Sequence, residues 1–223
     1  MNPVIIRDAT LYLGNNMEIM ERLRADAVIT DPPYGIGADE AVARNKGKNG
    51  WKYYGDTTWD RYPPPKEVFD LMRKISKDQI IWGGNYFTDS LPPTMQWLVW
   101  DKGQRDFSLA DCEFAWSNQR KAARIFDYSR GKALQDGKEH PTQKPVELMK
   151  WCLDFVPKAR SVLDPFMGSG TTGVACAKKG VQFIGIEINE QYFEIACRRI
   201  EKAYDQPDMF VAPAVAEKQE TML

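Results

Sequence analysis

Histidine is scarce in this sequence, and its cysteines are unpaired. The four cysteines, Cys112, Cys152, Cys176 and Cys197, are scattered, and none belongs to a Cys-x-x-Cys pair. This spacing argues against a zinc site and a disulfide framework, and it favours a reducing compartment. His140 is the only histidine, which excludes a Ser-His-Asp triad elsewhere in the chain and a multi-histidine metal site. We therefore expect no bound metal.

Long hydrophobic runs are also missing. No apolar run approaches the roughly 20 residues that a membrane-spanning helix needs, and the N-terminus lacks a signal-peptide pattern. Of the 223 residues, 43% are hydrophobic and 27% charged, which is ordinary for a globular protein. The length fits one compact domain over residues 1–223. We expect no membrane partner.

The net charge of −1 does not by itself suggest a polyanionic partner. The charge is unevenly distributed, however. Residues 102–138 carry eight basic and five acidic side chains, and residues 36–54 carry four basic and two acidic ones. Two basic segments on an acidic body could contact a polyanion on one face, although solvated loops would show the same pattern.

Hydrophobic periodicity predicts alternating strands and helices. Strands are expected at 10–13, 27–29, 79–82, 161–163 and 182–188, helices at 16–24, 66–77, 145–155, 171–179 and 190–204, and an antiparallel strand pair at 97–100 and 114–116. Residues 36–65 read as a long loop, functional or mobile, and residues 205–223 as an extended tail. The pattern indicates an α/β fold with a doubly wound, mostly parallel Rossmann-like sheet.

Residues 161–172 have the order strand, glycine-rich turn, helix. Gly168 and Gly170 permit close approach of the backbone to a ligand, and Thr171 or Thr172 could cap the helix. Asp164 stands at the strand end, where a carboxylate would repel a pyrophosphate but suits the ammonium group of S-adenosylmethionine. The string also differs from the Gly-x-Gly-x-x-Gly of a NAD site. An ordinary strand–helix turn is the structural alternative.

Glu187 ends the following predicted strand. A carboxylate at that position can accept hydrogen bonds from ribose hydroxyls, as it does in dinucleotide-binding folds.

Asp31-Pro32-Pro33-Tyr34 follows a buried strand and should lie at the same sheet edge as the glycine turn. The prolines stiffen the turn. Asp31 and the carbonyl of Pro32 can each accept an N–H of an exocyclic base amine, which favours a pyramidal nitrogen whose lone pair faces a methyl donor. Tyr34 offers a stacking face to a base that is flipped out or single-stranded. The alternative is a Pro-Pro turn with a capping aspartate and a surface tyrosine.

These motifs resemble the amino-methyltransferases that modify DNA. Asp31-Pro32-Pro33-Tyr34 matches their catalytic motif, residues 164–170 match their cofactor loop, and residues 140–145 (His-Pro-Thr-Gln-Lys-Pro) match the segment that precedes that loop. The order, with the catalytic motif first, resembles the permuted group called class β. The resemblance implies S-adenosylmethionine as cofactor, DNA as partner and a cytoplasmic, prokaryotic or phage-type protein.

The resemblance also implies site residues. Those expected at the cofactor are Asn15, Asp31, Thr142, Lys144, Asp164, Phe166, Gly168, Gly170, Thr171, Thr172 and Glu187. The family often has an acid at the position of Asn15, where it meets the cofactor adenine; an amide oxygen can still accept from an adenine amino group. His140 is assigned no proton chemistry.

DNA contacts are expected in two segments. Residues 102–139 correspond to a small target-recognition region, and residues 36–65 mix cations with aromatic side chains, as a strand-gripping loop would. The basic residues expected at DNA are Arg44, Lys46, Lys48, Lys52, Arg105, Arg120, Lys121, Arg124, Arg130 and Lys132. A homodimer would widen the footprint on DNA.

The expected activity is methylation of adenine N6 in DNA, because aspartate as the first residue of the tetrapeptide favours adenine in this family. Cytosine N4 is the second interpretation. An inactive DNA-binding regulator with the same fold is a third, although such a protein would not need Asp31, Tyr34 and Asp164. RNA or protein glutamine as substrate and a NAD-dependent dehydrogenase are more remote.

Overall fold

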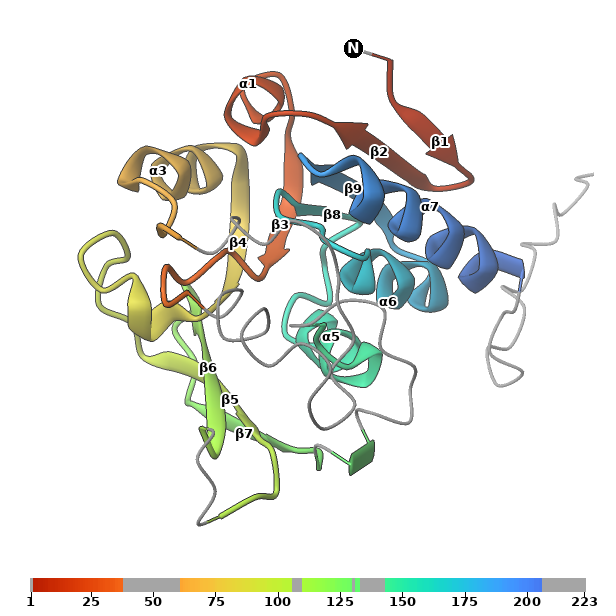
Figure 1. Ribbon diagram of the computed structural model, residues 1–223. Coiled ribbons are helices and arrows are strands. Elements are labelled where there is room, and N and C mark those ends of the chain that lie inside the picture. Colours follow the sequence, from red (N-terminus) through yellow and green to blue (C-terminus); the bar gives the residue numbers. More distant parts are fainter. Residues whose placement is uncertain (1, 38–60, 106–109, 130, 133–142, 206–223) are drawn as a thin grey trace, which may run out of the picture.

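The structure is a computed structural model that describes residues 2–37, 61–105, 110–129, 131–132 and 143–205. In these residues a nine-stranded sheet carries helices on both faces (Figure 1). The strands are β1 (Val4–Ile6), β2 (Ala9–Leu13), β3 (Ala25–Thr30), β4 (Ser76–Trp82), β5 (Gln96–Asp101), β6 (Cys112–Ser117), β7 (Arg124–Asp127), β8 (Ser161–Asp164) and β9 (Gln182–Glu187). The helices are α1 (Asn16–Met20), α3 (Lys66–Ile75), α5 (Val146–Leu153), α6 (Thr171–Lys179), α7 (Glu190–Asp205) and the 3-10 helix η1 (Gly84–Tyr86).

The strand order in the sheet is β1-β2-β9-β8-β3-β4-β6-β5-β7. From β2 to β4 the five neighbouring strands are parallel, whereas β1 is antiparallel to β2 and β6 is antiparallel to both β4 and β5. This arrangement confirms the predicted doubly wound, mostly parallel sheet with an antiparallel strand pair.

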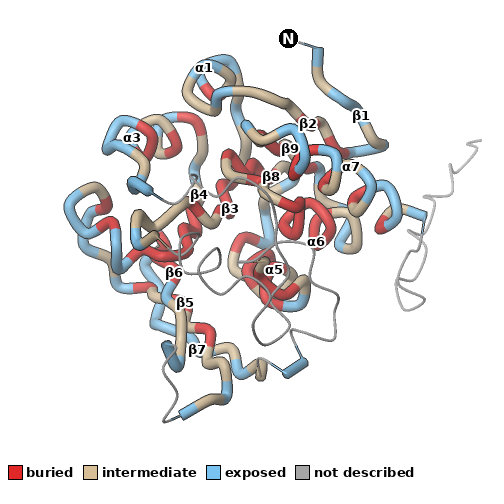
Figure 2. Tube along the Cα trace, in the orientation of Figure 1, coloured by how far each residue is buried: buried red, intermediate tan, exposed pale blue. Residues whose placement is uncertain are grey.

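The central strands are buried on both faces, which is why they read as continuous apolar runs. In β3, Ala27 and Ile29 belong to the core beneath α5, α6 and α7, whereas Val28 belongs to the core beneath α1 and α3. The same alternation recurs in β4, where Ile80 and Ile81 lie on opposite faces. Figure 2 shows the buried residues concentrated in these central strands and on the inner sides of the helices.

The direction of winding reverses between β3 and β8. From β3 the chain passes through α3 to β4 on one side, and from β8 it passes through α6 to β9 on the other. Because α3 and α6 cover opposite faces, the first turns after β3 and β8 diverge and leave a crevice at the carboxyl ends of these strands. Such a switch point is where doubly wound sheets bind ligands.

Several boundaries differ from the sequence predictions. Strands β1 and β7 were missed, because each is a short edge strand with little burial: Ile5 and Ile125 are exposed. Helix α1 ends at Met20 rather than at residue 24. Helix α7 continues to Asp205, and the remainder of the predicted tail, like most of the loop at 36–65, lies outside the described residues.

Among the residues that the structure describes, no helix is long and apolar enough to cross a membrane. The cytoplasmic location and the single-domain boundaries stay predictions.

Candidate active site

Two aspartates stand side by side at the crevice. Asp164 is the last residue of β8 and Asp31 directly follows β3, and these strands are parallel neighbours paired through Val28 and Leu163. Both aspartates line a cavity of about 490 Å³, a size typical of small-molecule sites. Other residues of its wall are Gly14, Asn15, Pro33, Lys144, Phe166, Gly168, Thr171, Thr172, Glu187 and Tyr192.

Asp164 is 3% exposed and is held by three donors. The hydroxyl of Thr30 donates to Oδ1 at 2.6 Å, that of Thr172 donates to Oδ2 at 2.7 Å, and the backbone N–H of Phe166 donates to Oδ1 at 3.1 Å. Burial nevertheless raises the pKa of Asp164 to about 6. A carboxylate has about four acceptor positions, so one is left for a cationic group in the cavity, whose charge would offset the cost of burial.

The glycine turn adopts the positive φ angles that glycine permits. At Gly168 (φ 52°) an added Cβ would meet no atom within 4 Å, so the backbone presents an open surface toward the cavity. At Gly170 (φ 79°) an added Cβ would lie 2.9 Å from Cβ of Ala196, so this glycine lets α6 approach α7 closely. Gly170 itself occupies the N-cap of α6. The prediction that Thr171 or Thr172 caps the helix was wrong, because Thr172 turns its hydroxyl to Asp164 instead.

Glu187 ends β9 and organises the neighbouring loops. Its carboxylate accepts from the backbone N–H groups of Gly168 and Asn189, both at 2.8 Å, and burial raises its pKa. Next to the end of β9, where the backbone N–H of Gly14 donates to the carbonyl oxygen of Glu187 at 2.8 Å, Asn15 is the N-cap of α1, and its amide oxygen accepts from the backbone N–H of Met17 at 2.9 Å. The oxygen expected to meet the cofactor adenine therefore already stabilises a helix end.

Contacts of the Asp31 and Tyr34 side chains hold the tetrapeptide in place. The hydroxyl of Tyr34 donates to Oδ1 of Asp31 at 2.6 Å. The Tyr34 ring stacks on Tyr86, with ring centroids 4.8 Å apart and an interplanar angle of 17°. Gly83 (φ 71°) packs against the same ring, and a Cβ there would overlap it. The Tyr34 ring, which is predicted to stack on a base, is thus already stacked on Tyr86.

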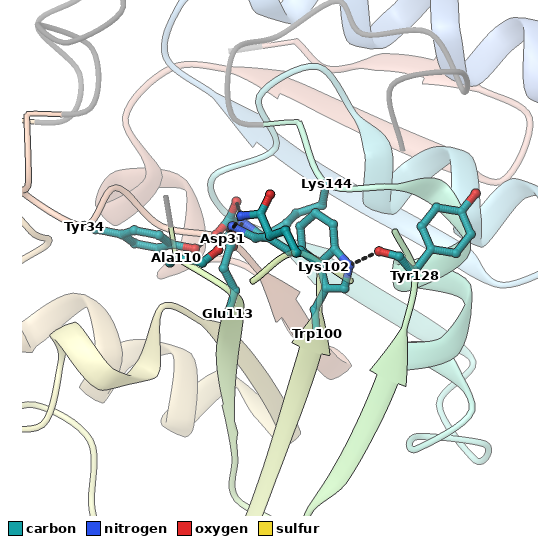
Figure 3. Close-up of polar contacts among 9 residues, drawn as sticks. Asp31, Tyr34, Trp100, Lys102, Ala110, Glu113, Tyr128 and Lys144 are labelled. Carbon is teal, nitrogen blue, oxygen red and sulfur yellow. Dashed lines mark hydrogen bonds and ion pairs between the residues drawn. The ribbon is translucent and has the colours of Figure 1, made fainter. Parts of the chain in front are cut away.

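A chain of alternating charges extends from Asp31 (Figure 3). Nζ of Lys144 donates to Oδ2 of Asp31 at 2.6 Å and lies 2.9 Å from Oε2 of Glu113. Oε1 of Glu113 is in turn 2.6 Å from Nζ of Lys102. Burial raises the pKa of Asp31, and the nearby ammonium of Lys144 opposes this. Burial would also raise the pKa of Glu113, but Lys144 and Lys102 hold it at about 2.

Lys144 is 5% exposed, and its pKa lies above the ordinary value. Burial acts to lower this pKa, but the carboxylates of Asp31 and Glu113 outweigh burial. The ammonium group is therefore a fixed charge at neutral pH. Lys144 was predicted from the resemblance as a cofactor residue; its contact with Asp31 was not anticipated. Glu113 and Lys102 were missed as site residues, because neither belongs to a motif.

The predicted cofactor residues are largely brought together. All of those that the structure describes line the cavity except Gly170, which packs under α7. Pro32 is buried and does not line the cavity, whereas Pro33 does. Thr142 and His140 lie outside the described residues.

The predicted DNA-binding residues are not all near the cavity. Arg105 follows β5 at the edge that carries Asp31, and it is paired with Asp101 at 2.6 Å. Arg120 and Lys121 follow the end of β6, which is antiparallel, so they lie at the opposite edge of the sheet. There Nζ of Lys121 is 3.5 Å from the carbonyl oxygen of Phe155. Arg124 and Lys132 are exposed. Arg44, Lys46, Lys48, Lys52 and Arg130 lie outside the described residues.

Comparison with known proteins identifies the family to which this protein belongs. A family model described as DNA methylase, which covers N6 and N4 methyltransferases, matches residues 81–198. The chain belongs to this family. The Type II methyltransferase M2.DpnII of Streptococcus pneumoniae is 36% identical to it over 79% of this chain and 82% of its own length. The DNA adenine methyltransferase YhdJ of Escherichia coli is 41% identical over 40% of this chain and 31% of its own length.

Solved structures of DNA methyltransferases share the fold. The M1.HpyAVI–SAM complex aligns with a TM-score of 0.56 at 23% identity, over 86% of this chain and 98% of that protein. The cytosine-N4-specific PvuII DNA methyltransferase aligns with a TM-score of 0.54 at 15% identity, over 88% of this chain and 91% of that protein. The predicted family, the class β DNA amino-methyltransferases, is confirmed.

Proposed function

We propose that this DNA methyltransferase transfers a methyl group from S-adenosylmethionine to the N6 amino group of adenine in DNA. One observation carries the proposal. Asp31, which begins the tetrapeptide, shares a single cavity with two further acids that end neighbouring strands, the buried Asp164 and the half-buried Glu187. A methyl donor and an acceptor for a base amine can therefore meet at one point.

The cavity residues fit S-adenosylmethionine. Asp164 offers a buried carboxylate to the methionyl ammonium, and Glu187 offers one to ribose hydroxyls. The open surface at Gly168 leaves room for the ligand. A structure with the same fold, M1.HpyAVI, is a complex with SAM. When bound, the cofactor would supply a methyl group from a positively charged sulfur: the carbon–sulfur bond would break as the nitrogen lone pair forms the new nitrogen–carbon bond, and its electrons would stay on sulfur. The surplus proton of the amine would pass to the carboxylate of Asp31, which accepts its N–H.

Asp31 would orient the base amine. The lone pair of an exocyclic amine is delocalised into the ring, so the nitrogen is a poor nucleophile until its N–H groups are drawn out of the ring plane. The carboxylate of Asp31 and the carbonyl oxygen of Pro32 are acceptors at adjacent positions of a turn stiffened by two prolines. Two directed hydrogen bonds lower the barrier by orientation and electrostatics, and no covalent enzyme intermediate is needed.

The target base must leave the helical stack to reach this point, because its amine is inaccessible within a duplex. Tyr34 supplies an aromatic surface beside Asp31. Tyr86 already stacks on Tyr34. A base that stacks on Tyr34 would extend or displace this aromatic pair.

Adenine is favoured over cytosine by the aspartate at the first position of the tetrapeptide, following the family preference. The relative YhdJ carries the name of a DNA adenine methyltransferase. The PvuII enzyme has the same fold and is specific for cytosine N4, so cytosine N4 is the second candidate.

The test is incubation of the protein with unmethylated DNA and methyl-labelled S-adenosylmethionine, followed by digestion to nucleosides. Label in N6-methyladenine supports the proposal, and label in N4-methylcytosine replaces it by the second candidate. The Asp31→Ala variant should lose turnover at least about 100-fold and retain the affinity for the cofactor within a few-fold. Retained turnover would remove Asp31 from the catalytic site, and no label from the wild type on DNA of varied sequence would refute methyl transfer.

A further inference from the structure

Glu113 lies outside every motif of the sequence, and yet it belongs to the network around Asp31 (Figure 3). It is reached through the antiparallel strand β6, whose first residues stand at the carboxyl edge of the parallel strands. There Glu113 pairs with Trp100 of β5, and its strand neighbour Ala115 pairs with Trp82, the last residue of β4. The sheet topology therefore carries a carboxylate to the edge at which β3 ends.

Lys144 is held from two sides. Its Nζ is 2.6 Å from Oδ2 of Asp31 and 2.9 Å from Oε2 of Glu113. Lys102 completes the set at 2.6 Å from the other oxygen of Glu113, and its Nζ lies 5.3 Å from the centre of the Trp100 ring. Two carboxylates and two ammonium groups balance to a net charge of zero, which limits the cost of keeping them in a largely buried site.

The orientation of the Asp31 carboxylate follows from these contacts. Tyr34 donates to Oδ1, and Lys144 donates to Oδ2. Nζ of Lys144 also donates to the hydroxyl oxygen of Tyr34 at 3.1 Å. The lysine stem is long and flexible, so contacts with Asp31 and Tyr34 alone would let the ammonium swing away from both. The ion pair with Glu113 at 2.9 Å adds a second carboxylate to the ammonium, which confines Lys144 beside Asp31 and so restricts the orientation of the Asp31 carboxylate.

We propose that Glu113 is a positioning residue for methyl transfer, which anchors Lys144 by a second ion pair and thereby holds the Asp31 carboxylate in the orientation that receives the target amine. The inference rests on the proposed function. Glu113 does not touch the reacting atoms in this scheme but acts through Lys144.

The network makes an electrostatic prediction that distinguishes positioning from simple support of the fold. The groups that face Asp31 are Tyr34, Lys144 before α5, Glu113 on β6 and Asp164 on β8. After burial and the opposing effect of Lys144, the negative charge of Glu113 raises the pKa of Asp31. Removing Glu113 removes this effect but also releases Lys144, whose larger effect lowers the pKa of Asp31, so the acid limb of kcat should move to higher pH. If Glu113 acted through its charge alone, the limb would move to lower pH. Removing the positive charge of Lys102 should also move the limb to higher pH.

The experiment compares Glu113→Gln, Glu113→Asp and Lys102→Met with the wild type, measuring kcat and KM for DNA at saturating S-adenosylmethionine from pH 5 to 9. Glu147→Gln is the matched control, because Glu147 pairs with Lys150 on the exposed side of α5, at 3.2 Å. We expect Glu113→Gln to lower kcat at least about tenfold and to change KM less than about threefold. Glu113→Asp should recover part of the loss, and the control should match the wild type.

Both charge changes should shift the acid limb to higher pH, each by about half a pH unit or more. A Glu113→Gln variant with kcat within twofold of the wild type, or one whose acid limb moves to lower pH, overturns the role of Glu113. If Glu113→Gln does not fold, Lys102→Met provides the test, because an acid limb of kcat that stays at its wild-type pH in this variant also overturns the role of Glu113. A wild type that labels no DNA base refutes the proposed function and this inference together, whereas an active wild type with an active Glu113→Gln refutes the inference alone.

Discussion

Replacing Asp164 with asparagine should stabilise the fold at neutral pH while it removes cofactor binding. Burial raises the pKa of this carboxyl from 3.8 to about 6. At about 1.4 kcal/mol for each factor of ten, the ionised form costs the folded protein about 3 kcal/mol relative to the protonated form. Asparagine resembles the protonated form in shape and charge. The hydroxyls of Thr30 and Thr172 can rotate to serve as donor or acceptor to its amide.

The sign of the pH dependence follows from linkage. A carboxyl whose pKa is higher in the folded state binds more protons when folded, so the wild type loses stability as the pH rises from 3.8 through about 6. The Asp164→Asn variant lacks this loss. Its free energy of unfolding should exceed that of the wild type by about 1 to 3 kcal/mol at pH 8, and the difference should shrink toward zero at pH 4.

Urea unfolding at the two pH values measures this difference, and other ionisable groups cancel because wild type and variant share them. The matched control is Asp205→Asn, at an aspartate whose side chain is 63% exposed and whose partner is Arg7. That change should alter the free energy of unfolding by less than about 1 kcal/mol at either pH. An excess stability of Asp164→Asn that is equal at pH 4 and pH 8 would contradict the reasoning.

Titration calorimetry with S-adenosylmethionine tests the functional half of the prediction. Loss of the carboxylate that pairs with the ammonium should weaken binding at least about 30-fold, equivalent to about 2 kcal/mol. In the wild type, affinity should fall as the pH drops through about 6, because Asp164 takes up a proton there. Binding by Asp164→Asn within threefold of the wild type would refute the assignment of Asp164 to the ammonium.

Three other substitutions give separate tests. Tyr34→Phe keeps the ring but removes the hydroxyl that donates to Asp31 at 2.6 Å, so kcat should fall about tenfold with little change in KM for DNA; an unchanged kcat would show that this hydrogen bond does not matter. Gly170→Ala would place a Cβ 2.9 Å from that of Ala196 at positive φ, so urea unfolding should show a loss of about 2 to 4 kcal/mol. The Cβ added by Gly168→Ala meets no neighbour, so this variant should lose only about 1 kcal/mol of its free energy of unfolding. Its methyl group should weaken cofactor binding, which calorimetry measures. Equal losses of stability in the two glycine variants would contradict the packing argument.

The sequence by itself determined the features that depend on neighbours along the chain. Runs such as Ala27-Val28-Ile29 predict strands buried on both faces, because no polar side chain interrupts them. An acid directly after such a strand, as at Asp31 and Asp164, must lie at the carboxyl edge of a parallel sheet. The proline pair and the glycine turn then specify the local backbone. Fold class, cavity wall and family could therefore be predicted from short strings and their order.

Only the tertiary structure decided which distant side chains meet. Lys144 and Asp31 are separated by 113 positions, and Glu113 joins them because β6 runs against its neighbours, which no local pattern encodes. The same reversal carries Arg120 to the far edge of the sheet, away from the cavity, although it was predicted among the residues that contact DNA. Strand direction and strand order are set by pairing between segments far apart in the chain, so the charge network around Asp31 exists only once the sheet has formed.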